Sequence, residues 1–272
     1  MIQDNILSFR RSKYLKWAAA VVLGCVLLYA LDQPPIRPGG GTWLGYGLGT
    51  LGAALILWLL AFGMRKRAYS STLGTVRGWL SAHVYLGLAL AVVATLHTGF
   101  QFGWNVHTLA YAMTISVIVS GIWGVVLYLR QPALMGNLLN GQTLQQYGQL
   151  LRDSDDQSRI LAASMTPEIQ SLMAASANGK IFSHYWQRFT GTNAKCMTQK
   201  VVDWLGQQSY DVPTSLQELY TLQFRRLQQL NRIREYVRLR TWTEIWLVFH
   251  VPMSFALLGS LIAHIVSVFF YW

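Results

Sequence analysis

Apolar residues gather in five long segments of this chain, and polar residues separate them. By hydropathy the segments cover about Tyr14–Leu31, Thr42–Met64, Gly78–Phe102, Leu109–Leu129 and Trp246–Trp272. A hydrocarbon core about 30 Å thick is crossed by about 20 helical residues, and each segment is close to that length or longer. The pattern therefore predicts an all-α, polytopic membrane protein built as a five-helix bundle.

A long polar region separates the fourth apolar segment from the fifth. We expect residues 1–130 to form the first four transmembrane helices and residues 131–240 to form a mostly helical cytoplasmic insert. Residues 241–272 then form the fifth transmembrane helix. No G-x-G-x-x-G motif, P-loop or cysteine cluster occurs in the insert, so no nucleotide or iron–sulfur site is predicted there.

Local signals predict several elements within the insert. Thr-Pro-Glu at 166–168 is typical of a helix start with Pro at its first position, and Ala-Asn-Gly at 177–179 is typical of a helix stop. Ile181–Phe189 fits either a strand or a short helix. From Ser215 onward, apolar residues recur at helical spacing amid Arg and Gln, which predicts an amphipathic helix leading into the fifth segment. Its apolar face is expected to pack on the insert, with docking of a soluble redox protein as the alternative.

The positive charge of the chain follows the predicted topology. The composition is 53% hydrophobic and 12% charged, with a formal net charge of +11. Every Lys and Arg except Arg37 falls on one side of the predicted helices. The positive-inside rule makes that side cytoplasmic, so we expect a bacterial inner-membrane protein with a cytoplasmic N-terminus and a periplasmic C-terminus. Topology accounts for the basicity, and no nucleic-acid partner is predicted.

The first apolar segment also has features of a secretory signal peptide, because a basic stretch precedes it. The sequence Asp-Gln-Pro-Pro at 32–35 follows it in place of a small-residue cleavage site, so a membrane helix is predicted. Cys25 and Cys196 fall in different predicted compartments. A disulfide is therefore not expected, and two separated cysteines do not hold an iron–sulfur cluster.

Two histidine pairs of identical spacing stand inside segments that contain no charged residue. His83 and His97 are fourteen positions apart in the third segment, and His250 and His264 are fourteen apart in the fifth. Fourteen residues make nearly four helical turns, so both members of a pair project from nearly the same face, roughly 21 Å apart. Polar side chains are costly in hydrocarbon, and the commonest reason for imidazole there is metal ligation. Two facing helices would then form two bis-histidine sites, for which haem is the natural occupant.

The predicted topology determines which histidines share a haem. The third and fifth segments both run outward and are therefore parallel. We expect His83 and His250 to bind an inner haem b, and His97 and His264 to bind an outer haem b stacked across the membrane from it. Iron with two axial imidazoles is saturated, which favours one-electron transfer over O2 binding. The alternative is that these histidines pack the helices or relay protons without haem.

The H-x13-H pair on the third segment and its match on the fifth resemble the dihaem membrane cytochromes b. The likeness is strongest to the ferric-reductase-like transmembrane family and its NADPH-oxidase relatives. It covers the five membrane segments, is carried mainly by the four histidines, and implies a bundle with two b haems. That family typically has a sixth helix and a flavin and nicotinamide domain after the haem helices, whereas this chain ends at Trp272. Electrons are therefore expected to pass through another subunit or a quinone.

Other residues are candidates for supporting roles. Arg77 and Arg240 precede the third and fifth segments and are candidate cofactor-binding residues for the inner haem propionates, with interfacial anchoring as the alternative. His107 is expected at the outer surface, with a quinone-site or proton-transfer role as the alternative. Glu244 is expected to anchor the fifth helix or to handle protons.

These inferences predict a membrane-embedded dihaem cytochrome b subunit that passes electrons between a quinone pool and a partner redox subunit. The expected partners are the lipid bilayer and a flavoprotein, an iron–sulfur protein or a cytochrome c, with a quinone as an additional ligand. One alternative is a stand-alone ferric-reductase-like protein fed by a separate flavoprotein. Another is a haem-free scaffold or transporter subunit that uses its histidines for protons.

Overall fold

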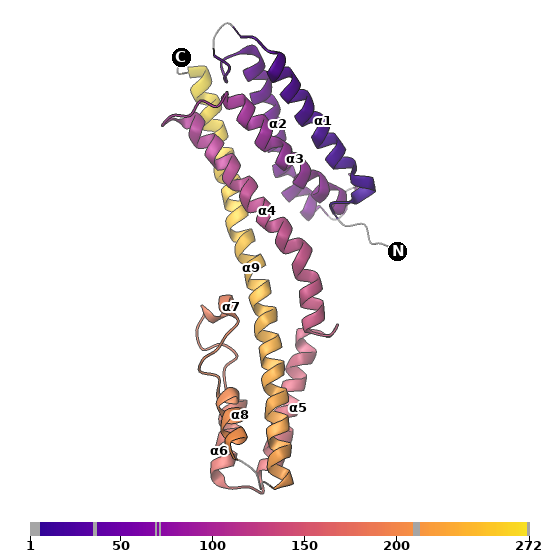
Figure 1. Cartoon of the computed structure of the whole chain (residues 1–272), viewed down its shortest axis with the longest axis vertical. Helices are drawn as coiled ribbons and strands as arrows, with labels where there is room; N and C mark the ends of the chain where they lie inside the picture. The colour runs from indigo at the N-terminus through magenta and orange to yellow at the C-terminus, as the bar shows by residue number, and fades with distance from the viewer. Residues whose placement is uncertain (1–5, 35–36, 69, 71, 209–212, 271–272) are drawn as a thin grey trace. The chain divides into compact units, whose positions relative to one another are not determined.

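The computed structural model describes residues 6–34, 37–68, 70, 72–208 and 213–270, and the described elements are all helices (Figure 1). Five helices are long and apolar enough to cross a membrane. They are α1 (Phe9–Leu31), α2 (Trp43–Arg67), α3 (Val76–Thr98), α4 (Val106–Leu138) and α9 (Thr214–Phe270). The predicted all-α class and the five apolar helices are confirmed, and the chain is a helical membrane protein. The last two residues of the predicted fifth segment lie outside the described part.

The helix ends differ from the hydropathy boundaries for local reasons. The third segment was expected to continue to Phe102, but α3 ends at Thr98 because Gly99 adopts the left-handed conformation with a φ of 56°. α4 continues well beyond Leu129. α9 has 57 residues, because the predicted amphipathic helix and the predicted fifth segment form one uninterrupted helix. Hydropathy marks only the apolar part of a helix that also has a polar part.

The chain divides into two compact units, which we call the membrane unit and the insert unit. The membrane unit comprises residues 1–126 and 246–272, and the insert unit comprises residues 127–245. The predicted boundaries after 130 and 240 lie four to five residues from these divisions. α4 and α9 each contribute one part to the membrane unit and another part to the insert unit. The four shorter helices belong to the insert unit.

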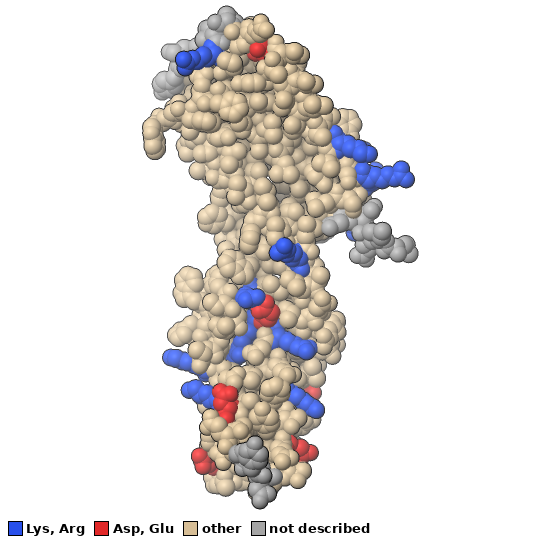
Figure 2. Space-filling view, viewed as in Figure 1, with Lys and Arg blue, Asp and Glu red and all other residues tan. Residues whose placement is uncertain are grey.

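α3 is the central helix of the membrane unit. Its Val93 and Leu96 pack with Cys25 of α1 and Leu48 of α2. Its Leu90 belongs to a second cluster, which joins Ile56 of α2 to Leu257 and Leu261 of α9. On the face shown in Figure 2, the middle of this unit is free of charged side chains, which lie toward its ends. The outer surface is therefore suited to hydrocarbon, while α3 is held on several sides by other helices.

The insert unit is a small helical domain with its own apolar core. Its shorter helices are α5 (Leu144–Ala162), α6 (Pro167–Ala177), α7 (Gln187–Thr190) and α8 (Met197–Gln207). α6 starts and stops where the sequence predicts. From α9, the buried residues Leu219, Leu227, Leu230 and Ile233 pack against α5, α6 and α8 and against Leu139, which follows α4. The apolar face of the amphipathic helix thus packs on the insert, as expected.

A strand over Ile181–Phe189 was one of two predicted alternatives, and it is wrong. Within the described residues of that stretch, the only regular element is the single turn of α7. The Gln187 side-chain oxygen accepts hydrogen bonds from the backbone N–H groups of Ser183, at 2.7 Å, and His184, at 3.2 Å. These bonds satisfy the backbone donors locally and favour a turn over an extended strand.

Candidate functional site

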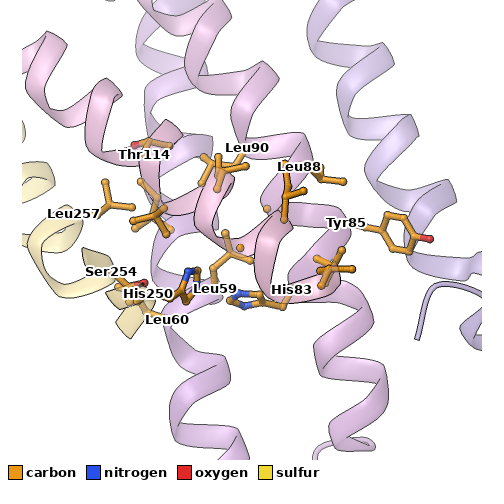
Figure 3. Close-up of a pocket in the computed structure, with 18 of the residues that line it drawn as sticks. Leu59, Leu60, His83, Tyr85, Leu88, Leu90, Thr114, His250, Ser254 and Leu257 are labelled. Carbon is orange, nitrogen blue, oxygen red and sulfur yellow. Dashed lines mark hydrogen bonds between the residues drawn. The ribbon is translucent and has the colours of Figure 1, made fainter. Parts of the chain in front are cut away.

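His83 and His250 line a cavity of about 250 Å³ in the membrane unit. Its walls come from α2, α3, α4 and α9 and are mainly apolar, and we call it the His83 cavity. Figure 3 shows the two imidazole rings at the same end of the cavity, with Leu90 and Thr114 toward the other end. Each ring comes from a different long helix, so the cavity combines one histidine from α3 with one from α9.

His97 and His264 line a second cavity of about 630 Å³, which we call the His97 cavity. The centroids of the two rings are 5.9 Å apart, and the ring planes are nearly perpendicular. A metal ion bound by both rings holds their nitrogens about 4 Å apart, since each bond is about 2 Å. The observed ring separation is compatible with that arrangement. His107 also lines this cavity.

The structure therefore brings together the two members of each predicted pair. His83 lies with His250 in one cavity, and His97 lies with His264 in the other. This pairing requires α3 and the membrane part of α9 to run in the same direction. Ligation of haem by the two pairs stays a prediction.

The ring of His97 is held by the backbone of α2. Its Nδ1 lies 2.8 Å from the carbonyl oxygen of Gly45. A carbonyl only accepts hydrogen bonds, so Nδ1 of a neutral His97 carries the proton and Nε2 keeps its lone pair. A Cβ added to Gly49 would lie 2.7 Å from Cε1 of His97, so glycine at this position leaves the space that the ring occupies. The ring is thus in the tautomer that binds a metal through Nε2.

His250 is held in a similar way by α4. Its Nδ1 lies 2.7 Å from the hydroxyl oxygen of Ser120. That hydroxyl donates its one hydrogen to the carbonyl of Val117, at 2.8 Å, so it must accept from His250. The nearby Trp246 donates from Nε1 to the carbonyl of Ser120 at 2.8 Å. His250 therefore also has its proton on Nδ1 and a lone pair on Nε2.

His264 has a histidine as its partner. Its Nδ1 lies 2.7 Å from Nδ1 of His107, and one of these nitrogens donates to the other. When His264 is the donor, its Nε2 carries the lone pair, as in His97. The sequence placed His107 at the outer surface, and the structure finds it exposed and in contact with a predicted ligand.

His83 differs from the other three histidines. Its Nδ1 is buried and has no hydrogen-bond partner among the described residues, and its ring lies 5.1 Å from that of Phe62. An unpartnered buried nitrogen costs free energy, because it has lost its hydrogen bond to water. Ligation of a metal would use such a nitrogen, which makes His83 suited to a ligand role.

The donor set fits a bis-histidine haem better than an ion held by protein alone. The described residues contain no group of three or more His, Cys, Asp or Glu side chains arranged to hold a metal ion. A zinc-type site needs three or four protein ligands, whereas a porphyrin supplies four nitrogens and leaves two axial positions for protein. Two histidines in a largely apolar cavity provide those two ligands.

The two predicted propionate partners are not brought to the cavities. No Lys or Arg is among the described residues that line either of them. Arg77 is the second residue of α3 and is exposed. Arg240 belongs to the insert unit, where its Nε donates to Glu244 at 2.8 Å. Glu244 therefore has an ion-pair partner, and the propionate roles of the two arginines stay predictions.

Sequence reasoning missed the groups that orient the histidines. Ser120 and the glycines of α2 are small residues, which commonly serve helix packing in membranes, so the sequence alone does not indicate that they orient imidazole rings. Only Gly45 and Gly49 had a usable signal: their spacing of four residues places both on one helix face.

Comparisons of the chain with protein-family models, with curated proteins and with solved structures found no match. The resemblance to dihaem membrane cytochromes b therefore rests on the histidine spacing.

Proposed function

We propose that this chain is a membrane dihaem cytochrome b subunit, with one haem held by His83 and His250 and the other by His97 and His264. The observation that carries the proposal is the tautomer of the imidazole rings and the hydrogen bonds that hold them in their cavities. His97 and His250 each donate from Nδ1 to a fixed acceptor and keep Nε2 free for a metal. Haem bound by two histidines supplies reversible one-electron transfer.

The residues of the chain have defined tasks in this proposal. The Gly45 carbonyl and the Ser120 hydroxyl fix the tautomer and the rotation of their imidazoles, which raises the basicity of Nε2. The apolar walls of the His83 cavity exclude water from the ligands. The two sites are roughly 21 Å apart along α3, so together they span much of the hydrocarbon thickness.

The proposed cellular role follows from the separation of the two haem sites across the membrane. We infer that the subunit passes electrons across a bacterial inner membrane between a quinone pool and a partner redox subunit such as a flavoprotein, an iron–sulfur protein or a cytochrome c. The distribution of Lys and Arg supports a cytoplasmic N-terminus and insert unit and a periplasmic C-terminus. A C-terminal alkaline phosphatase fusion would be active in that topology, and an inactive phosphatase with a fluorescent C-terminal GFP fusion would contradict it.

Haem content tests the proposal directly. The full chain is purified in detergent from a haem-replete host, and its pyridine haemochrome spectrum is measured with protein quantitation. Two b haems per chain are expected, with about one lost in each single His→Ala variant at the four ligand positions. The matched control is His184→Ala, because His184 is exposed in the insert unit. A folded wild-type chain without haem would overturn the proposal.

One observation favours a haem-free alternative. The bond between His107 and His264 joins an exposed histidine to a partly buried one in the membrane unit, as a proton relay requires. A transporter subunit built on such a relay would purify without a visible spectrum, so the same measurement distinguishes the two functions.

A further inference from the structure

The insert unit carries an exposed aromatic cluster, which consists of Tyr185, Trp186 and Phe189 in and beside α7 together with Trp242 of α9. Phe189 links its members. Its ring centroid lies 6.0 Å from that of Tyr185 and 5.4 Å from that of Trp186. The ring of Trp242 lies edge-on to Phe189 at 6.3 Å.

This aromatic cluster contributes little to the core of the insert unit. Trp186 is 74% exposed and Tyr185 is 65% exposed, and neither belongs to the two buried clusters of the unit. Large aromatic surfaces are costly to leave in water, and a contiguous exposed patch of them marks an interaction site.

The segment that presents the aromatic cluster is built by specific hydrogen bonds. The Asn193 side-chain amide donates to the carbonyls of Lys180 and Ile181, each at 3.2 Å. Its oxygen accepts from the Ser183 hydroxyl at 3.1 Å. Together with the Gln187 bonds described above, these contacts hold both ends of the turn. The aromatic side chains are therefore displayed from an ordered segment.

The position of Trp242 along α9 identifies the environment of the aromatic cluster. Trp242 stands four residues before Trp246, where the uninterrupted apolar run of α9 begins, and Glu244 is the last charged residue before that run. Four helical residues span about 6 Å. The headgroup layer on each side of the hydrocarbon core is about 5–7 Å thick. The distance along α9 from Trp242 to the start of the apolar run is thus no greater than the thickness of the headgroup layer.

The charges near the aromatic cluster match lipid headgroups. The Arg188 guanidinium lies over the ring of Tyr185, at 5.4 Å from its centroid. Arg238 and Arg240 occupy the same short stretch of α9 as Trp242, where they form ion pairs with Glu235 and Glu244. Trp and Tyr favour the interface between hydrocarbon and water, and arginine pairs well with phosphate.

We propose that the aromatic cluster is a membrane anchor: Tyr185, Trp186 and Phe189 insert into the headgroup layer of the membrane that the chain itself spans, beside Trp242, while Arg188 contacts lipid phosphates. Lipid is the occupant because the covalent continuity of α9 brings Trp242 to this depth in every copy of the protein. The anchor ties the insert unit to the membrane surface. It requires no haem and stands independently of the proposed function.

Lipid accessibility at position 186 tests the anchor. A nitroxide is attached to Trp186→Cys of the full chain, in a background with Cys25→Ala and Cys196→Ser, and the protein is placed in lipid nanodiscs. Collision with O2, which concentrates in lipid, is compared with collision with a water-soluble nickel chelate. The matched control is a nitroxide at Tyr220→Cys, an exposed aromatic position on α9 that lies 26 residues before Trp246. The anchor predicts a several-fold higher ratio of O2 to nickel collisions at position 186.

Equal ratios at the two positions in a folded protein would overturn the anchor. The same holds if the label at 186 stays accessible to water in the nanodiscs and is shielded only when a soluble protein is added. If the Trp186→Cys variant does not fold, Tyr185→Cys provides the same readout on the neighbouring side chain. Nanodiscs with anionic lipid are expected to raise the ratio above that in zwitterionic lipid, and Arg188→Gln to remove the difference.

Discussion

The hydroxyl of Ser120 on α4 is 2.7 Å from Nδ1 of His250 on α9, and it can only accept a hydrogen bond there. Its own hydrogen is already donated to the Val117 carbonyl. A single serine thus fixes the tautomer of a histidine that is 130 positions away in the sequence. This relationship links the packing of α4 against α9 to the chemistry of the His83 cavity.

Ser120→Ala removes the acceptor for His250 and is expected to weaken haem binding at that site by about 10–100-fold, the usual cost of losing a group that orients a metal ligand. The comparison is Ser254→Ala, because Ser254 lines the same cavity but its hydroxyl donates to the backbone carbonyl of His250 and not to the ring. Haem retention is measured by titrating each variant with an apo-myoglobin competitor. Equal retention in the two variants would show that Ser120 does not orient the ligand.

Gly49→Ala is expected to displace the ring of His97, because the new Cβ would lie 2.7 Å from Cε1. About one of the two haems per chain should be lost, together with the EPR signal of that site. Gly47→Ala is the matched control on the same helix, since a Cβ there meets nothing within 4 Å. Alanine at an unobstructed helical position stabilises by about 0.4–1 kcal/mol. Full haem content in Gly49→Ala would contradict the assignment of His97 as a ligand.

Arg226 is buried in the insert unit and forms an ion pair with Asp155. It also donates to Thr198, and so connects α9 to α5 and α8. Arg226→Ala leaves Asp155 without its counter-charge and is expected to destabilise the unit by about 3–5 kcal/mol. Limited proteolysis of the full chain should show faster cleavage within the insert. Arg225 is adjacent and exposed, so the Arg225→Ala variant should be cleaved at the wild-type rate. Equal cleavage rates for the two variants would contradict the structural role of the ion pair between Arg226 and Asp155.

Cys196 makes the stability of the insert unit depend on pH. Burial alone raises the pKa of its thiol, but hydrogen bonds from Arg234, at 3.1 Å, and from nearby backbone N–H groups, with the guanidinium charge, lower the pKa below its ordinary value. The folded state therefore favours the thiolate. This contribution is complete above the unfolded thiol pKa of about 8.5 and is lost as the pH falls through the lowered folded value.

The thermal midpoint of the wild type, relative to Cys196→Ser, should accordingly rise with pH in the window below about 8.5. Cys25→Ser serves as the control, because Cys25 lies in the membrane unit and should leave this pH dependence unchanged. If the difference in thermal midpoint between the wild type and Cys196→Ser does not change with pH, the folded state does not favour the Cys196 thiolate.

The sequence predicts those features of the structure that depend on one helix at a time. Apolar length identified the five long helices, and the spacing between His83 and His97 placed both rings on one face of α3. The direction of α3 and α9 followed from the distribution of basic residues. These are properties of local periodicity, which a single sequence contains.

Features that depend on two helices escaped prediction. The role of Ser120 depends on the rotation of α4 against α9, and that of Gly49 on the rotation of α2 against α3. Periodicity indicates which face of a helix is buried but not which residue on the neighbouring helix meets it. The insert unit shows the same limit, because Leu219 and Leu227 were identified as one apolar face while their contacts with α5, α6 and α8 were not.

Haem stoichiometry in double variants tests the central claim most directly, because the pairing of the histidines makes a non-additive prediction. His83→Ala combined with His250→Ala should lose only the one haem that each single variant loses, since both ligands serve one site. His83→Ala combined with His97→Ala should lose both haems. Loss of both haems in the first combination, or no haem in the folded wild type, would contradict two bis-histidine sites shared between α3 and α9.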